Sequence, residues 1–253
     1  MPGRSICMAL FLLISLSFAA AGPLFVRQVA PDGDFTGCGT NVTEADVLAA
    51  EREFTQHKEN LFSDSSLDDL GLGPIAIDVY WHIVAANATL EGGWANFDEE
   101  GSEIIICRGL TLRNEQIDAQ MEVLNKDYQD AGVTFKHINT TRIVSPEWFE
   151  KVKQGSQGAD AMKTIFRKGG ADSLNVWTVG FPQSGLLGYA TFPWTYRREP
   201  EIDGVIIRYS TLPGGVAPKH EGGRTLTHEA GHWLGLYHTF QARANPGTTK
   251  INF

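Results

Sequence analysis

Cysteine is scarce in this sequence, which has three cysteines in 253 residues. Cys7 lies in a leader that we expect to be removed, so the mature chain keeps Cys38 and Cys107. In an oxidising compartment, the simplest interpretation is a single disulfide between them. This stays open, because the geometry decides whether two sequence-distant cysteines can bond.

Long apolar runs are also rare. Residues 9–18 are apolar, follow Arg4 and precede the small residues 19–21, which is the layout of a signal peptide. This run is too short for a comfortable membrane span, and charges or glycines interrupt every later one. We therefore expect a signal peptide at residues 1–21 and no membrane attachment after its removal. A retained anchor is the alternative.

Positive charge is in deficit, with 21 Lys and Arg against 30 Asp and Glu and a formal net charge of -9. An acidic chain disfavours nonspecific binding to nucleic acid, so we expect no nucleic-acid partner. Hydrophobic residues make up 42% and charged residues 20%, values typical of a globular protein rather than a disordered one. The length suits one domain with a leader and an N-terminal extension, or at most two small domains.

Three glycosylation sequons support passage through the secretory route. They begin at Asn41, Asn87 and Asn139. Together with the leader, they predict a secreted, extracellular glycoprotein.

After the leader, the chain divides near Pro74. Residues 22–40 are rich in Gly, Pro, Asp and Thr, residues 43–58 favour a helix that Thr43 can cap, and residues 63–73 form a polar linker. We assign residues 22–73 to an N-terminal extension and residues 74–253 to the main domain.

The main domain alternates strand and helix patterns. Apolar, β-branched segments predict strands at 75–84, 133–138, 174–179, 186–191 and 204–209. Ile117, Met121, Leu124 and Tyr128 form one stripe on a predicted helix at 112–131, which we expect to back a sheet. The fold class is therefore α/β with a mixed sheet. His82, within the first strand, is interpreted as a core or surface residue rather than a ligand.

Residues 228–238 read HEAGHWLGLYH and carry the chemistry. His228 and His232 are four residues apart, so on a helix they share one face and can reach one metal ion. Gly235 can adopt a left-handed conformation and turn the chain, which brings His238 back as a third ligand. Three protein ligands leave the fourth position open, as in catalytic zinc sites.

Glu229 is offset from the preceding His228 by about 100° on the helix. It can lean toward a metal-bound water without being a ligand, and so act as general base. A helix with unrelated histidines, or a structural zinc, is the alternative. A structural site would usually be closed by a fourth protein ligand and would not explain Glu229. The acidic residues between 98 and 103 are interpreted as a solvated loop, so calcium is possible but not supported by the sequence.

The 228–238 sequence resembles the extended zinc-binding motif of metzincin metalloproteases. The flanking residues are similar to the pappalysin (cytophagalysin) group, and most similar to fungal extracellular metalloproteases. The resemblance covers residues 75–86 and 110–241, including 172–180, 184–193 and 203–215. It implies a zincin-like fold (α/β or α+β), with a mixed, mainly parallel twisted sheet, a backing helix and an active-site helix.

The resemblance also implies one catalytic Zn²⁺ ion, protein or peptide substrates, and a monomer. It places Gly188, Tyr189 and Ala190 on the cleft-side edge strand, where a substrate would align as an added strand. In related enzymes a propeptide cysteine can occupy the open zinc position, so residues 22–73 are a candidate propeptide. Cys38 is a candidate for this latency, in competition with the disulfide to Cys107.

The sequence departs from this family at two places. Metzincins carry a methionine turn beneath the zinc, but in this chain no methionine follows Met162. Residues 242–253 also no longer resemble the family. We therefore expect a C-terminally truncated catalytic domain that lacks the methionine turn and the lower subdomain. Trp233, Leu234 and Leu236 would then lose part of their cover and form an exposed apolar patch. Residues 87–108 look like an insertion.

Three functions remain open at this point. The first is a secreted zinc endopeptidase that uses His228, His232 and His238 as ligands and Glu229 as base. The second is a truncated, catalytically inactive relative that binds zinc. The third is a noncatalytic interaction module that has kept the fold.

Overall fold

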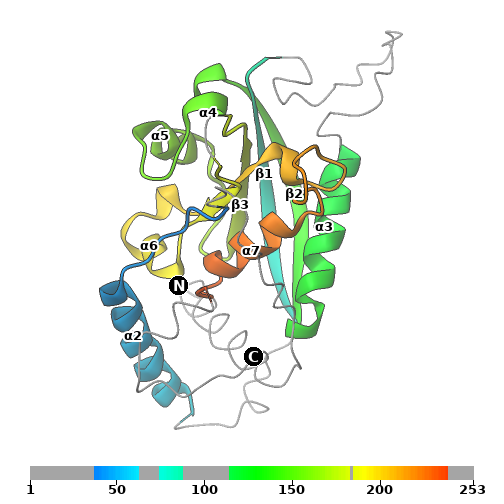
Figure 1. The fold of residues 1–253 in the computed structure, drawn as a ribbon. Helices are drawn as coiled ribbons and strands as arrows, with labels where there is room; N and C mark the ends of the chain where they lie inside the picture. Colours follow the sequence, from blue (N-terminus) through cyan, green and yellow to red (C-terminus); the bar gives the residue numbers. More distant parts are fainter. Residues whose placement is uncertain (1–36, 63–73, 88–113, 183–184, 239–253) are drawn as a thin grey trace.

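The computed structural model describes residues 37–62, 74–87, 114–182 and 185–238 (Figure 1). The strands are β1 (Ile75–Ala85), β2 (Val133–Val144), β3 (Ser173–Val179), β4 (Gly188–Ala190) and β5 (Val205–Arg208). The helices are α2 (Glu44–Phe62), α3 (Asn114–Tyr128), α4 (Pro146–Lys151), α5 (Gln157–Phe166), α6 (Pro193–Arg198) and α7 (Arg224–Trp233). Short 3-10 turns follow at η2 (Gln129–Ala131), η3 (Pro200–Ile202) and η4 (Tyr209–Thr211).

The five strands form one sheet in the order β2-β1-β3-β5-β4. All neighbours are parallel except β4, which runs antiparallel to β5 at the edge. This confirms the predicted mixed, mainly parallel sheet. The strand predicted at 133–138 continues to Val144, because β2 pairs with β1 along its whole length even though most of its side chains are exposed.

Helices cover both faces of the sheet. On one face, α3 and α7 pack against inward side chains such as Val205 and Ile207, and on the other, α4 and α5 pack against Ile206 and its neighbours. This alternation along β5 is what a strand buried on both faces requires. Figure 1 shows α3 in green and α7 in orange beside the sheet, with α4 and α5 at its other side.

The predicted stripe on α3 is buried, with Ile117 and Leu124 fully enclosed and Met121 and Tyr128 nearly so. The backing helix is therefore confirmed. Its last turn tightens into η2 and ends at Gly132, whose φ of 68° is left-handed.

The segment before β1 packs against the rest of the molecule. Thr43 Oγ1 accepts from the Asp46 amide at 3.2 Å, which confirms the predicted cap of α2. In Figure 1, α2 is blue and the segment preceding it runs to the middle of the molecule, where Cys38 forms a parallel bridge with Gly188. No described helix is long and apolar enough to cross a membrane.

Candidate metal and active site

Helix α7 presents the first two histidines. Leu226 and Ala230 are buried in the core and fix one side of the helix against the sheet. His228 and His232, one turn apart, lie on another side. Their Nε2 atoms are 3.1 Å apart.

The turn after α7 brings the third histidine, His238, back beside the first two. Gly235 has φ of 100°, a conformation that L side chains rarely adopt, so a glycine is required there. The Leu236 amide donates to the Gly231 carbonyl at 2.8 Å and closes the turn. His238 Nε2 consequently lies 3.2 Å from His232 Nε2, as the sequence pattern predicted.

These atoms fit a zinc ion. The three histidine nitrogens and Cys38 Sγ all lie within 4.8 Å of one another. Ligand atoms on a tetrahedral zinc with Zn–N bonds of about 2.0–2.1 Å lie roughly 3.3 Å apart, close to the observed separations. Imidazole nitrogen and thiolate sulfur are also the ligands that zinc prefers.

The protonation of the histidines suits ligation. His232 Nδ1 lies 2.7 Å from the Leu236 carbonyl oxygen, which can only accept, so Nδ1 carries the proton and Nε2 is left as the ligand atom. Burial lowers the pKa of His228 to about 4, with a further contribution from His238. Burial likewise lowers the pKa of His232 to about 3. Both are therefore neutral near pH 7, as metal binding needs.

Glu229 lies beside this cluster and is 1% exposed. Its Oε2 accepts from the Thr40 hydroxyl at 2.9 Å and lies 3.6 Å from Cys38 Sγ. Burial raises the pKa of Glu229 to about 7, and the two hydrogen bonds oppose that rise. Gly188 packs directly against it, because a Cβ at Gly188 would lie 2.9 Å from Glu229 Cγ.

Cys38 lies at the open side of the histidine cluster. Its Sγ is 3.5 Å from His232 Nε2 and forms no disulfide within the described part of the chain. Cys107, the predicted disulfide partner, lies outside the described residues. Burial raises the pKa of the Cys38 thiol to about 12, and the nearby Glu229 carboxylate adds to this.

The predicted edge strand carries an added strand, which is the chain's own segment 37–40. The Gly39 amide donates to the Gly188 carbonyl at 2.8 Å, and the Leu187 amide donates to the Gly37 carbonyl at 2.8 Å. The ring of Tyr189 is buried in the core beside Phe181.

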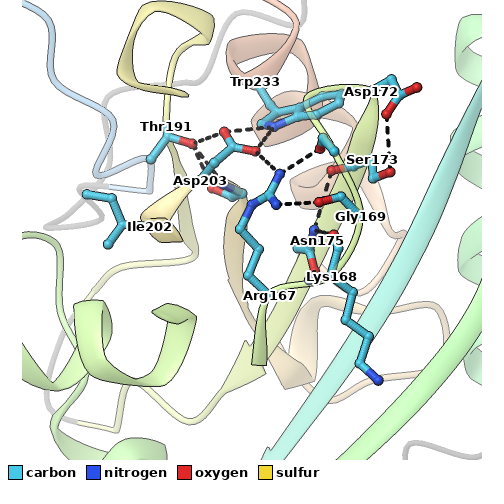
Figure 2. A network of polar contacts seen from close by, with 12 residues as sticks. Arg167, Lys168, Gly169, Asp172, Ser173, Asn175, Thr191, Ile202, Asp203 and Trp233 are labelled. Carbon is cyan, nitrogen blue, oxygen red and sulfur yellow. Dashed lines mark hydrogen bonds and ion pairs between the residues drawn. The ribbon is translucent and has the colours of Figure 1, made fainter. Parts of the chain in front are cut away.

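A buried aspartate ties the active-site helix to the sheet (Figure 2). Trp233 Nε1 lies 3.1 Å from both carboxylate oxygens of Asp203, which is 1% exposed. Thr191 Oγ1 donates to Asp203 at 2.9 Å, and Arg167 forms an ion pair with it at 3.4 Å. The network thereby joins α7, the end of β4 and the end of α5.

This network corrects one expectation. Trp233 and Leu234 are 5% and 3% exposed, so the predicted apolar patch is wrong for these two residues. Trp233 is held against Asp203 and the main core, a contact that the local sequence did not indicate. Leu236 is half-buried.

Sequence reasoning missed two residues of this region. Thr40 and Asp203 each contact α7, which is distant from them in sequence. No local sequence pattern indicated either residue. The three predicted glycosylation sites, Asn41, Asn87 and Asn139, all lie at exposed positions. The predicted leader, residues 88–108 of the predicted insertion, and residues 239–253 lie outside the described residues.

Comparison with known proteins places the chain among metalloproteases. No family profile matches it. It is 42% identical over 133 residues to an extracellular metalloprotease of Arthroderma benhamiae, covering 51% of this chain and 43% of that protein. It is 32% identical over 236 residues to an extracellular metalloprotease of Colletotrichum graminicola, covering 91% of this chain and 71% of that protein.

A solved structure shares the fold. A Tannerella forsythia promirolysin mutant superposes with a TM-score of 0.51 at 23% identity, covering 80% of this chain and 69% of the other. The shared fold is of the zincin-like α/β class. More particularly, the chain belongs to the extracellular metalloprotease family of its fungal relatives. It spans less than half the length of the Arthroderma protein and about 71% of the Colletotrichum one.

Proposed function

We propose that this chain is a secreted zinc-dependent endopeptidase that hydrolyses peptide bonds of extracellular proteins. The observation that carries the proposal is the convergence of three imidazole nitrogens beside the buried carboxylate of Glu229. Zinc held by His228, His232 and His238 would supply a Lewis acid and an acidified water. The names of the fungal relatives favour an extracellular location.

Glu229 serves as the general base. It accepts a proton from the attacking water at a carboxylate oxygen and passes it to the leaving amine nitrogen. A base whose pKa is near 7 can both take and release a proton near neutral pH. The carboxyl is positioned by α7 on one side and by the close approach of Gly188 on the other.

Peptide substrates bind along β4. Gly188 and Leu187 use main-chain groups to hold residues 37–40, and a substrate would use the same groups once that segment leaves. Tyr189 and Ala190 contribute main chain only, because their side chains are buried. We expect a monomer with one zinc ion and no requirement for calcium or nucleic acid.

Residues 22–73 act as a propeptide in this proposal. Cys38 Sγ lies close enough to the three histidine nitrogens to close the fourth coordination position. Zinc would deprotonate a thiol that is otherwise held neutral by burial. This geometry favours latency over a Cys38–Cys107 disulfide.

The test is casein cleavage by the purified secreted protein in a Cys38→Ala/Thr40→Val background, which removes both the thiol beside the histidines and the hydroxyl bound to Glu229. We expect cleavage that a zinc chelator abolishes and that Glu229→Gln lowers by at least 100-fold while one zinc stays bound. Glu122→Gln, an exposed acid on α3, is the matched control and should keep full activity. Stoichiometric zinc without any cleavage would reject the endopeptidase and favour the inactive zinc-binding relative.

A further inference from the structure

Thr40 contacts two parts of the proposed machinery at once. Its hydroxyl donates to Glu229 Oε2 at 2.9 Å and accepts from the Ala190 amide at 2.9 Å. The residue is 2% exposed, and its own amide donates to Cys38 Sγ at 3.4 Å. A single side chain therefore bridges the general base and the substrate-binding strand.

The directions of these two bonds follow from the groups. An amide N–H can only donate, so the hydroxyl accepts from Ala190 with a lone pair. Its one proton is then available to Glu229, whose ionised carboxylate can only accept. Both bonds are buried, so losing the hydroxyl leaves a buried acceptor and a buried donor without this partner.

The segment around Thr40 is shaped for close contact. A Cβ at Gly39 would lie 2.7 Å from Leu186 Cδ1 and 3.4 Å from Tyr189 Cβ, so a larger residue there would displace the end of the Leu186 side chain. The Gly39 amide then bonds the Gly188 carbonyl. Thr40 follows at the position where its side chain reaches between Glu229 and Ala190.

We propose that Thr40 is a second inhibitory latch, which occupies the general base and the edge strand without needing the metal. This inference rests on the proposed function, because it assigns regulation to the same site. Cys38 holds the segment through zinc, whereas the bonds of Thr40 are made to protein groups alone. Removing zinc should therefore release the thiol but leave residues 37–40 on β4.

The first experiment measures amide hydrogen exchange by NMR in the full chain, with zinc removed by a chelator. We expect the Ala190 amide to stay protected in the wild type. Thr40→Val should speed its exchange by about tenfold or more, since the buried hydroxyl that accepts from this amide is lost. Thr40→Ser keeps the hydroxyl and should stay within about threefold of the wild type.

The Val79 amide, in the interior strand β1, reports on the whole fold. It should exchange equally slowly in the wild type and in Thr40→Val. If Thr40→Val does not fold, the exchange rates of Ala190 and Val79 in the zinc-free wild-type protein test the proposal without the variant. Fast Ala190 exchange on chelation, with Val79 still slow, would mean that metal and thiol alone hold the segment, and would overturn the proposal. Unchanged Ala190 exchange in a folded Thr40→Val protein would overturn it equally.

These readouts are independent of peptide-bond cleavage. If no variant cleaves casein but Ala190 exchange follows the expected order, the endopeptidase assignment fails and the latch stands. If casein is cleaved in the Cys38→Ala/Thr40→Val background but Thr40→Val leaves exchange unchanged, the latch fails and the protease stands.

Discussion

Glycine at position 188 allows the edge strand and the general base to touch. A side chain there would meet Glu229 Cγ at 2.9 Å and the Ile206 carbonyl oxygen at 3.1 Å. Neither group can move away easily, because Glu229 lies on helix α7 and the Ile206 carbonyl belongs to strand β5. The position thus links substrate binding to the geometry of the base.

Gly188→Ala should lower casein cleavage by at least tenfold, because a displaced carboxylate no longer meets the attacking water. Zinc content should stay at one per chain, since the atoms nearest to a Cβ at this position belong to Glu229 and Ile206 rather than to a histidine. Gly222→Ala is the control, because a Cβ there has no neighbour within 4 Å. Unaltered cleavage by Gly188→Ala in the Cys38→Ala/Thr40→Val background would show that this contact does not position Glu229.

At the scale of elements, α7 is held by packing and by one buried carboxylate. Asp203 joins the indole of Trp233 to Thr191 beside β4 and to Arg167 after α5. Lys163, also buried, donates to the Ile202 and Gly204 carbonyls on either side of Asp203. The carboxylate is therefore compensated by charge as well as by hydrogen bonds.

Asp203→Asn should lower the free energy of unfolding by about 2–4 kcal/mol, because it leaves buried cations without their counterion. Urea unfolding monitored by tryptophan fluorescence measures this. Asp130→Asn changes an exposed aspartate and should shift stability by less than about 0.5 kcal/mol. Equal stability of the two variants would mean that the network contributes nothing net to holding α7.

At the scale of the whole molecule, burial of ionisable groups makes stability depend on pH. His82 is fully enclosed and stacks on Trp177 with ring centroids 4.7 Å apart. Asn175 Oδ1 accepts from the Lys168 amide and from His82 Nε2, so the ring is neutral with its proton on Nε2. Burial lowers the pKa of His82 to about 4.

The unfolded chain binds a proton on this histidine below pH 6.5, whereas the folded chain does so only near pH 4. The free energy of unfolding should therefore be highest above pH 6.5 and fall as the pH drops toward 4, by up to about 3 kcal/mol from this residue. His82→Phe should flatten that fall in urea titrations of the zinc-free protein. His137→Phe, at an exposed position, should retain the wild-type slope. If the unfolding free energy of His82→Phe falls with pH as steeply as that of the wild type, His82 is not the source of this pH dependence.

Much of the fold was predictable where local periodicity reflects burial. The stripe from Ile117 to Tyr128 and the apolar segment of β5 each matched a buried element. The extent of β2 was not predictable, because residues 136–139 are exposed and the rest of the strand is defined by pairing with β1. For the same reason the edge strand predicted at 186–191 is a strand only over Gly188–Ala190.

The histidine cluster follows from local sequence. Helical spacing places His228 and His232 on one face, and Gly235 turns His238 back within a few residues, so the interactions involved are all local. Which residues contact that cluster depends on the packing of distant segments. The contact of Thr40 with Glu229 spans 189 positions and that of Asp203 with Trp233 spans 30. Such contacts depend on how strands and helices pack together, which the periodicity of a single segment does not encode.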